Sequence, residues 1–380
     1  MKGDGEELRR SIRLRPAMYI GGMDSRGLYF LLDPLLLLGF IGDGCVRDVA
    51  VELRPDGSCR VSYSGWPWSG PVGRKALEDL AGWFTFDSYD WKARPSAGVP
   101  LGILLQSPYV DLGLVNALCS SLEVVAWGGG WTGGCRFREG LREMGRSSDS
   151  GVESSSTSTS GLCVTLTPDP ALFNPPRRVP AQQLVARMRS LSAMKTGVGW
   201  SLRDEVSGVE TRFLRTRGLA DLCDELAENT GCLPEPWSFE GQMGSTRVRL
   251  ALQWSRFRGA GIHSWANLHP ALLGGVHHQG FHLGLRKVLR ARLKARAPQH
   301  PALIPPDEEL EKHLTAVLDL QVPEAVWHGP TRSQLGNPEV KSEVAWLVAR
   351  WLEKAFAADS AMEAQVLSEL CLPMKPVDPE

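Results

Sequence analysis

The sequence GLYFLLDPLLLLGFIGDG at residues 27–44 contains an apolar run that indicates a globular fold. The run from Leu28 to Ile41 is about 14 residues long and is broken by an aspartate, a proline and a glycine, whereas a bilayer-spanning helix needs roughly 20 apolar residues. It therefore predicts a helix packed into a protein core and no contact with a membrane.

Composition favours two domains. The chain has 380 residues, and domains average about 150 residues each. Its 42 basic and 43 acidic residues give a net charge of −1, so any contact with nucleic acid must be local. The eight cysteines form no C-x-x-C pair, which argues against a disulfide framework and against a cysteine zinc site.

The first residues of the chain form a polar leader. Its arginines at positions 9, 10, 13 and 15 are followed by neither the apolar core nor the cleavage site of a signal peptide. This pattern predicts a cytoplasmic protein.

Hydrophobic periodicity predicts strands and helices in both halves of the chain. The expected strands are 48–53, 59–64, 122–127, 161–168, 199–205, 248–254 and 314–322. The expected helices are 74–84, 110–122, 180–194, 219–228, 277–296 and 337–357. Residues 146–161, RSSDSGVESSSTSTSG, are too polar to bury and predict a mobile loop. Mixed elements in both halves predict an α+β fold twice.

Six segments, in this order, resemble the N-terminal half of DNA gyrase B and of its topoisomerase IV relative. They are LRPAMYIGG (14–22), VNALCSSLEVV (115–125), TGVGWSLRDE (196–205), LALQW (250–254), NLHPALLGGVHHQGF (267–281) and TRSQLGNPEVKSEV (331–344). The resemblance implies a GHKL (Bergerat-type) ATPase α/β sandwich at 1–232. A ribosomal-S5-like transducer domain is expected at 233–380, with no Toprim domain after it.

The resemblance also implies a degenerate catalytic helix. In the family, the helix after the MYIG segment carries a Glu that activates water and, four residues later, an Asn that holds Mg²⁺. The Glu position falls on Pro34 or Asp33, and the Asn position on Leu38 or Leu37. An alkyl side chain cannot coordinate Mg²⁺, which demands oxygen ligands. We expect Asp33 to be an N-cap with Pro34 at the first helical position, in a helix whose catalytic face has become core.

The adenine contacts of the family also have altered counterparts. SGWPWS (64–69) replaces the DGRGIP turn, so that Ser64, followed by Gly65, stands where an Asp accepts the adenine amino group. Leu162 stands where a Thr supports that Asp. A serine hydroxyl can still make one neutral hydrogen bond, worth about 1 kcal/mol.

The phosphate contacts are weaker still. The Gly-rich lid corresponds to VPLGILLQSPYVDLG (99–113), where prolines and leucines remove the N–H groups and the freedom that a phosphate cradle needs. Arg332 matches the lysine that touches the γ-phosphate, but Pro330 replaces the Gln of the same motif. We therefore expect neither ATP nor Mg²⁺ as a cofactor, unless the chain is a divergent ATPase.

Two clusters on the expected helix 277–296 are candidate ligand sites. His278 and His282 share a face at i,i+4 beside His277, yet no further ligand with sensible spacing is evident beyond His263 or His269, and we expect no metal. Arg286, Arg290 and Lys294 form a basic stripe that would suit DNA phosphates, with a solvated basic face as the alternative.

Tryptophan is abundant, with 13 residues, and several replace polar or small residues of the family. They are Trp66, Trp68, Trp83, Trp91, Trp127 and Trp131. Because aromatic side chains dominate core and interface energetics, we expect these either to fill the vacated nucleotide pocket or to form a partner surface.

Together these features predict a gyrase-B-like pseudo-ATPase, a non-catalytic scaffold or regulator. Its expected partners are a second copy of the chain, DNA, or the subunits of gyrase and topoisomerase. One alternative is a divergent ATP-binding component of an ATP-dependent topoisomerase. Another is a DNA-binding module that needs no nucleotide.

Overall fold

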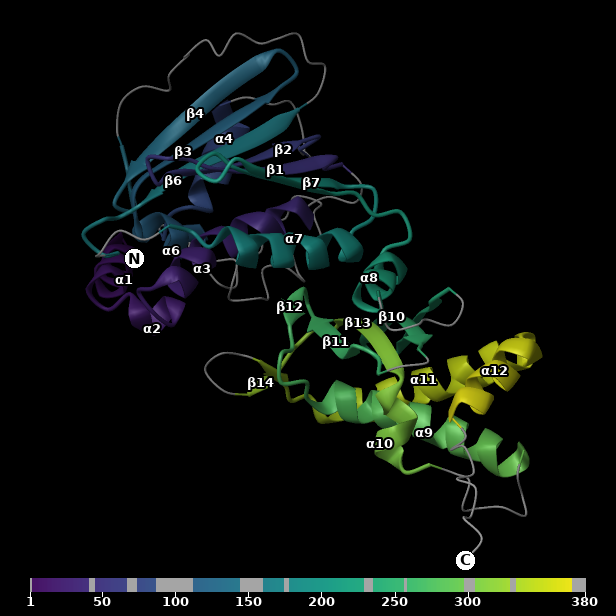
Figure 1. Cartoon of the computed structure of the whole chain (residues 1–380). Coiled ribbons are helices and arrows are strands. Elements are labelled where there is room, and N and C mark those ends of the chain that lie inside the picture. Colours follow the sequence, from purple (N-terminus) through teal and green to yellow (C-terminus); the bar gives the residue numbers. More distant parts are fainter. Residues whose placement is uncertain are drawn as a thin grey trace, which may run out of the picture. The chain divides into compact units, whose positions relative to one another are not determined.

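The chain divides into two compact units, Met1–Thr216 and Arg217–Glu380 (Figure 1). The computed structural model describes residues 2–40, 45–66, 74–86, 112–143, 160–173, 178–228, 235–255, 258–296, 305–328 and 333–370. The division after Thr216 falls earlier than the expected boundary near residue 232. As a result, helix α8 (Leu219–Leu226) belongs to the second unit.

The first unit is built on an eight-stranded sheet with the order β5-β4-β3-β6-β2-β1-β7-β8. Its strands are β1 (Asp48–Leu53), β2 (Cys59–Ser64), β3 (Cys119–Gly128), β4 (Trp131–Arg138), β5 (Leu141–Arg142), β6 (Gly161–Pro168), β7 (Gly199–Asp204) and β8 (Val209–Phe213). Every neighbouring pair is antiparallel except β1 and β7, which run parallel with Asp48 beside Gly199.

Helices cover this sheet. They are α1 (Lys2–Leu14), α2 (Ala17–Ile20), α3 (Ser25–Leu37), the 3₁₀ turn η1 (Leu38–Phe40), α4 (Arg74–Gly82), α6 (Leu112–Ala117) and α7 (Ala181–Met194). Helix α7 packs on β7, and α3 lies against α6 and α7, so α3 is enclosed by its neighbours (Figure 1). This enclosure explains why nine of the thirteen residues of α3 are buried.

Two local expectations need correction. The expected helix 110–122 is wrong in its second half, because the helix α6 ends at Ala117 and strand β3 begins at Cys119. Burial alternates along β3, with Leu122, Val124 and Ala126 inside, which is the period of two of a strand. The polar leader forms helix α1. The expected mobile loop, apart from its last two residues, lies outside the described residues.

The second unit has a five-stranded sheet with the order β12-β11-β13-β10-β9. Its strands are β9 (Trp237–Met243), β10 (Thr246–Trp254), β11 (Gly261–Ala266), β12 (His269–Pro270) and β13 (Leu314–Gln321), with a separate pair β14 (Trp327–His328) and β15 (Gln334–Leu335). Its remaining helices are α9 (Val276–Arg296), α10 (Asp307–Lys312), α11 (Pro338–Ala358) and α12 (Ser360–Leu370).

Both faces of this second sheet are covered. Alternate residues of β13, such as Leu318 and Leu320, join one apolar core with α9, α11 and α12. On the opposite face, α8 packs on β10 and β13, and the Sγ of Cys223 contacts the carbonyl of Thr315 at 3.6 Å. Burial on both sides explains why β13 is an almost continuous apolar run.

No helix among the described residues combines the length and the apolar character needed to cross a bilayer. The apolar run near the start of the chain is accounted for by α3 and η1, whose leucines are buried in the first unit.

Candidate functional site

Helix α3 begins a full two turns before the position expected from sequence. Asp24 is its N-cap and accepts a hydrogen bond from the backbone N–H of Arg26 at 3.0 Å. The expectation that Asp33 caps the helix and Pro34 opens it is wrong, since both lie inside α3. Asp24 fits the cap because a short acceptor side chain satisfies one of the unpaired N–H groups of the first turn.

Asp33 forms a buried ion pair with Arg187 of α7. Its Oδ1 lies 2.6 Å from Arg187 Nε and its Oδ2 lies 3.4 Å from Nη2, and the two side chains are 12% and 4% exposed. The hydroxyl of Tyr29, one turn earlier on α3, donates to the same Oδ1 at 3.1 Å. Pairing is what permits a carboxylate at this depth, because an unpaired buried charge is strongly unfavourable.

The pKa values around this pair reflect its burial. Burial raises the pKa of Tyr29, and the nearby Asp33 carboxylate raises it further, so the phenol remains a hydrogen-bond donor. Burial lowers the pKa of Arg187, but the charge of Asp33, the nearby Tyr29 and the hydrogen bond to Asp33 together raise it above its usual value, and the guanidinium remains a cation. The carboxylate is thus held by a permanent cation and a permanent donor.

This arrangement does not suit the role that the family gives to its catalytic Glu. A general base must reach a water with a free lone pair, whereas both oxygens of Asp33 face Arg187. Pro34, the other candidate for that position, has no ionisable group. Leu37 and Leu38, the candidates for the magnesium ligand, are both 1% exposed and pack in the core. These residues do not fit ATP with Mg²⁺.

The residues expected on the adenine side of the site also have partners within the protein. Ser64, at the end of β2, donates from Oγ to Asp48 Oδ2 at 2.6 Å on the neighbouring strand. Gly65 has a φ of +75°, and a Cβ there would lie 2.1 Å from the carbonyl oxygen of Cys45. The N–H of Gly65 donates to the carbonyl of Ser160 at 2.7 Å. The hydrogen bonds of Ser64 and Gly65 therefore connect the end of β2 to β1 and to the residue that precedes β6.

Aromatic packing occupies the space between β2 and α3. Tyr63 is buried and donates from its hydroxyl to the carbonyl of Leu35 on α3 at 2.6 Å. Trp66 is buried and meets the Tyr63 ring edge-on at 5.3 Å between centroids. Leu162 is fully buried opposite Tyr63 on β6. Trp66 is thus a core residue of the first unit, and the expectation that it fills a nucleotide pocket or forms a partner surface stays a prediction. Trp68 and Trp91 lie outside the described residues.

The residues expected on the phosphate side of the site fall mostly outside the described part of the chain. Residues 99–111 of the expected lid, and Arg332 with Pro330, lie outside the described residues. Leu112 and Gly113, the last residues of the expected lid segment, belong to helix α6 and are buried.

In the second unit, the histidines of α9 surround a serine. Ser264 Oγ lies 2.8 Å from His277 Nε2 and 2.7 Å from His278 Nε2. Burial lowers the pKa of His277 to about 3 and that of His278 to about 4, with a neighbouring histidine adding to each effect. His282 instead pairs with Glu311 at 2.5 Å. Among the described residues, no group of three or more His, Cys, Asp or Glu side chains could hold a metal ion.

The basic stripe of α9 is largely paired within the unit. Arg286 contacts Glu311 at 2.6 Å, and Arg286 and Arg290 both contact Asp307, at 3.3 and 2.5 Å. Lys294 is exposed. The two arginines therefore fasten α10 to α9, and a DNA phosphate would have to compete with these carboxylates.

Arg187 is the functional-site residue that the sequence patterns did not reveal. A signal was present, because Arg187 shares the buried face of α7 with Leu184, Met188 and Leu191 at helical spacing. A lone arginine on an apolar face predicts a buried acidic partner, although sequence alone does not identify Asp33 as that partner.

Comparison with known proteins shows which family the chain resembles. The sequence model described as DNA gyrase B matches residues 218–375. DNA gyrase B of Enterococcus faecalis is 26% identical over 381 residues, covering 96% of this chain and 57% of that protein. DNA gyrase B of Archaeoglobus fulgidus is 28% identical over 361 residues, covering 90% and 54%. The chain spans about half the length of the curated relatives it matches.

Solved structures agree on the fold. The 43K ATPase domain of Thermus thermophilus gyrase B, solved with an aminocoumarin, has a TM-score of 0.72 at 24% identity and covers 95% of this chain and 93% of its own. The B-subunit of the DNA gyrase from Myxococcus xanthus has a TM-score of 0.75 at 22% identity, covering 96% and 99%. The expected α+β fold is confirmed, since it matches these gyrase B structures. The resemblance to this half of gyrase B is confirmed as well.

Proposed function

We propose that this relative of the ATPase and transducer half of gyrase B is a pseudo-ATPase that acts as a nucleotide-independent scaffold or regulator. It uses neither ATP nor Mg²⁺. It keeps the fold of the family and has converted the interior of the nucleotide site into structural core.

One observation carries the proposal, the buried pair of Asp33 and Arg187. Asp33 is the only carboxylate at or beside the position of the catalytic Glu, and both of its oxygens face a guanidinium at 2.6 and 3.4 Å. Releasing it to activate water would break a buried ion pair, which costs about 3–5 kcal/mol. An ATPase would meet this cost in every turnover.

The rest of the site points the same way. An Mg²⁺ ion needs oxygen ligands, and the aligned positions are the buried Leu37 and Leu38. The serine at the adenine position is bonded to Asp48, and Trp66 and Tyr63 fill the space behind it. A bound nucleotide would have to displace both contacts.

The first test is a thermal-unfolding scan of the full chain with a non-hydrolysable ATP analogue and Mg²⁺ at about 1 mM. A Kd of about 10 μM would place this ligand near 100 times Kd and would stabilise the fold by roughly 2.7 kcal/mol. We expect no shift. The Thermus gyrase B ATPase domain, scanned in parallel, is the positive control.

A clear shift would favour the divergent ATPase instead. Hydrolysis by the full chain that disappears in Asp33→Asn would establish that alternative and end the pseudo-ATPase proposal. Hydrolysis that persists in Asp33→Asn would indicate a contaminating enzyme.

The DNA-binding alternative has less support, because two of its three candidate cations are paired with α10. It predicts a salt-dependent affinity for duplex DNA that collapses when Arg286, Arg290 and Lys294 are neutralised together. Since the relatives are named as enzyme subunits, we also expect a protein partner or a second copy, and sedimentation of the purified chain would detect the second copy.

A further inference from the structure

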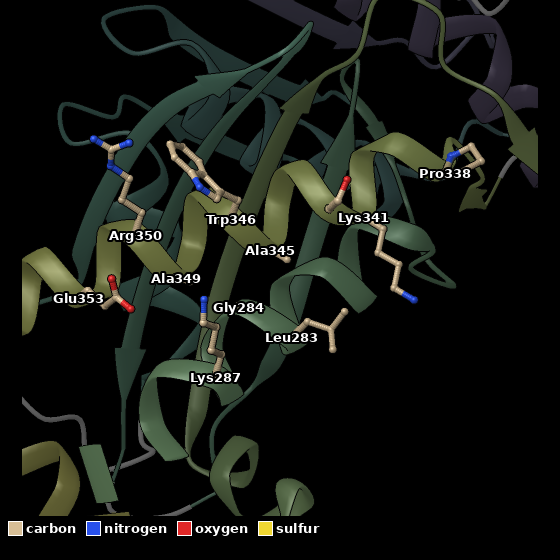
Figure 2. Close-up of a pocket in the computed structure, with 11 residues that line it drawn as sticks. Leu283, Gly284, Lys287, Pro338, Lys341, Ala345, Trp346, Ala349, Arg350 and Glu353 are labelled. Carbon is tan, nitrogen blue, oxygen red and sulfur yellow. The ribbon is translucent and has the colours of Figure 1, made fainter. Parts of the chain in front are cut away.

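Helices α9 and α11 form a groove on the surface of the second unit (Figure 2). Its volume is about 870 Å³. It is lined by Leu283, Gly284, Lys287, Pro338, Lys341, Ser342, Ala345, Trp346, Ala349, Arg350 and Glu353. We call it the α9–α11 groove.

The depth of the groove follows from small residues where the two helices meet. A Cβ added to Gly280 would lie 2.4 Å from the carbonyl oxygen of Lys341, and one added to Gly284 would lie 2.5 Å from that of Ala345. From the first contact to the second, the residue number rises by four on both helices, so the helices run in the same direction. Because the second contact pairs glycine on α9 with alanine on α11, no large side chain fills the groove between the two helices.

The walls of the groove combine apolar and cationic side chains. Leu283 is 51% exposed and Trp346 is 43% exposed, although both are large and hydrophobic. The guanidinium of Arg350 lies 4.8 Å from the centre of the Trp346 ring, as a cation–π pair (Figure 2). Exposed tryptophan and arginine side chains are typical of the energetic centre of a protein interface.

The charge of the rim is unbalanced. Lys287, Lys341 and Arg350 line the groove, against Glu353 as the one carboxylate among its lining residues. Within the described residues, neither lysine has an ion-pair partner, in contrast to Arg286 and Arg290 on the neighbouring face of α9. The groove therefore combines an apolar floor with a positive rim.

We propose that the α9–α11 groove binds an acidic amphipathic helix of a partner protein. The lining from Pro338 to Glu353 extends about 22 Å along α11 at 1.5 Å per residue, which matches four turns of a helix. Leucine or aromatic residues at i, i+3, i+4 and i+7 would lie against Leu283 and Trp346, and flanking Asp or Glu side chains would meet the lysines. The apolar floor favours such a helix over nucleic acid, whose affinity comes mainly from phosphates.

This inference gives the proposed scaffold a partner class, and it rests on the second unit alone. Its failure is distinguishable from that of the pseudo-ATPase proposal. Absence of both peptide and nucleotide binding would contradict the groove proposal alone. Binding of both the peptide and the nucleotide would contradict the pseudo-ATPase proposal alone.

The test uses a displayed library of 16-residue helices in which the apolar face and the flanking charges both vary, selected on the full chain. We expect enriched sequences with apolar i, i+3, i+4 and i+7 positions flanked by Asp or Glu. Their synthetic peptides should bind with a Kd of about 10 μM or tighter by fluorescence anisotropy.

Variants locate the binding site. Trp346→Ala should weaken binding about tenfold or more, as for an interface centre. Lys341→Glu should weaken it similarly and should be rescued by a Glu→Lys change in the peptide. The matched controls are Lys354→Glu, an exposed lysine of α11 outside the groove, and Leu272→Ala, an exposed leucine of the same unit, and both should bind normally.

Three results would overturn the proposal. The first is a library with no enriched sequence, or with peptides that bind Trp346→Ala as well as the unmodified chain. The second is displacement of the peptide by duplex DNA whose own binding is lost in Lys341→Glu, which would make the groove a nucleic-acid site. The third is concentration-dependent self-association abolished by Trp346→Ala, which would make its occupant a second copy of this chain.

Discussion

Helices α3 and α9 both bury ionisable side chains, and they accommodate them in opposite ways. On α3, the carboxyl group of Asp33 meets the guanidinium of Arg187 at 2.6 Å. On α9, His277 and His278 are neutral, because burial lowers their pKa values to about 3 and about 4. Ser264 then bridges two neutral rings.

The difference shows what each helix depends on. The α3 pair depends on the presence of both side chains. The packing of the α9 histidines depends on both rings remaining unprotonated. Substitution should therefore break the first arrangement, and acid should break the second.

The largest effect is expected from Arg187→Leu. Removing the guanidinium leaves Asp33 as an uncompensated buried charge, which should lower the free energy of unfolding by about 3–5 kcal/mol. Urea titration would measure it. The double variant Asp33→Leu with Arg187→Leu should recover most of the loss, because no buried charge then remains.

The matched control is Arg212→Leu. Arg212 pairs with Glu210 on the exposed strand β8, where an ion pair contributes about 0–1 kcal/mol. If the two arginine variants lost similar amounts of stability, the buried pair of Asp33 and Arg187 would contribute no more to the free energy of unfolding than an exposed pair does.

The next effect is a loss of stability in acid. An unfolded histidine takes up a proton near pH 6.5, whereas His277 and His278 do so only near 3 and 4 when folded. Stability is thus fully present above pH 6.5 and falls as the pH decreases below it. Each histidine should contribute a loss of roughly 2 kcal/mol between pH 7 and pH 5.

Urea titrations at pH 7 and pH 5 would measure this loss. His277→Gln should reduce the difference in the free energy of unfolding between pH 7 and pH 5 by about the contribution of one histidine. His328→Gln is the control, because His328 is exposed. An unchanged difference in His277→Gln would mean that His277 does not take part in the acid effect.

A smaller effect is expected from Gly284→Ala, which tests the packing of α9 rather than its charges. In an ordinary helix this change stabilises by up to about 1 kcal/mol. Here the new Cβ would meet the Ala345 carbonyl at 2.5 Å, so the helices must separate, at a cost of about 1–3 kcal/mol. A gain of stability in urea titration would contradict the close contact of α9 and α11.

The smallest effect is expected from Ser64→Ala. It removes one hydrogen bond to Asp48 in an exposed part of the sheet and should lower stability by about 0.5–1 kcal/mol. A loss comparable to that of Arg187→Leu would mean that the end of β2 contributes as much to the stability of the first unit as the buried pair of α3 does.

Local sequence patterns predicted about half of the described elements, and three strands of the first unit had the expected bounds. Strands β1, β2 and β6 begin and end where alternation and turn residues indicated. Helix α3 was misjudged because Asp-Pro is a strong start signal, and here the earlier Asp24 took that role. Tertiary enclosure lets Pro34 sit inside the helix, which local propensity does not foresee.

The candidate site was only partly predictable from the sequence. The leucines at the magnesium position follow from the motif alignment alone. The Asp33–Arg187 pair joins residues 154 positions apart, and such pairing depends on how α3 and α7 pack. The exposure of Trp346 beside Leu283 likewise follows from the contact of α9 with α11, not from either helix's own pattern.

The parallel pairing of β1 with β7 has a consequence for the synthesis of the protein. On the ribosome, β1 emerges roughly 150 residues before its partner, and at about 5–20 residues per second it waits on the order of ten seconds or longer. During that interval β1 can pair only with β2, and its other edge, Val49 and Val51 included, is open to strands of other chains. The sheet of the first unit is therefore completed only after β7 has been synthesised. The yield of folded protein in the cell should depend on how fast translation reaches residue 204.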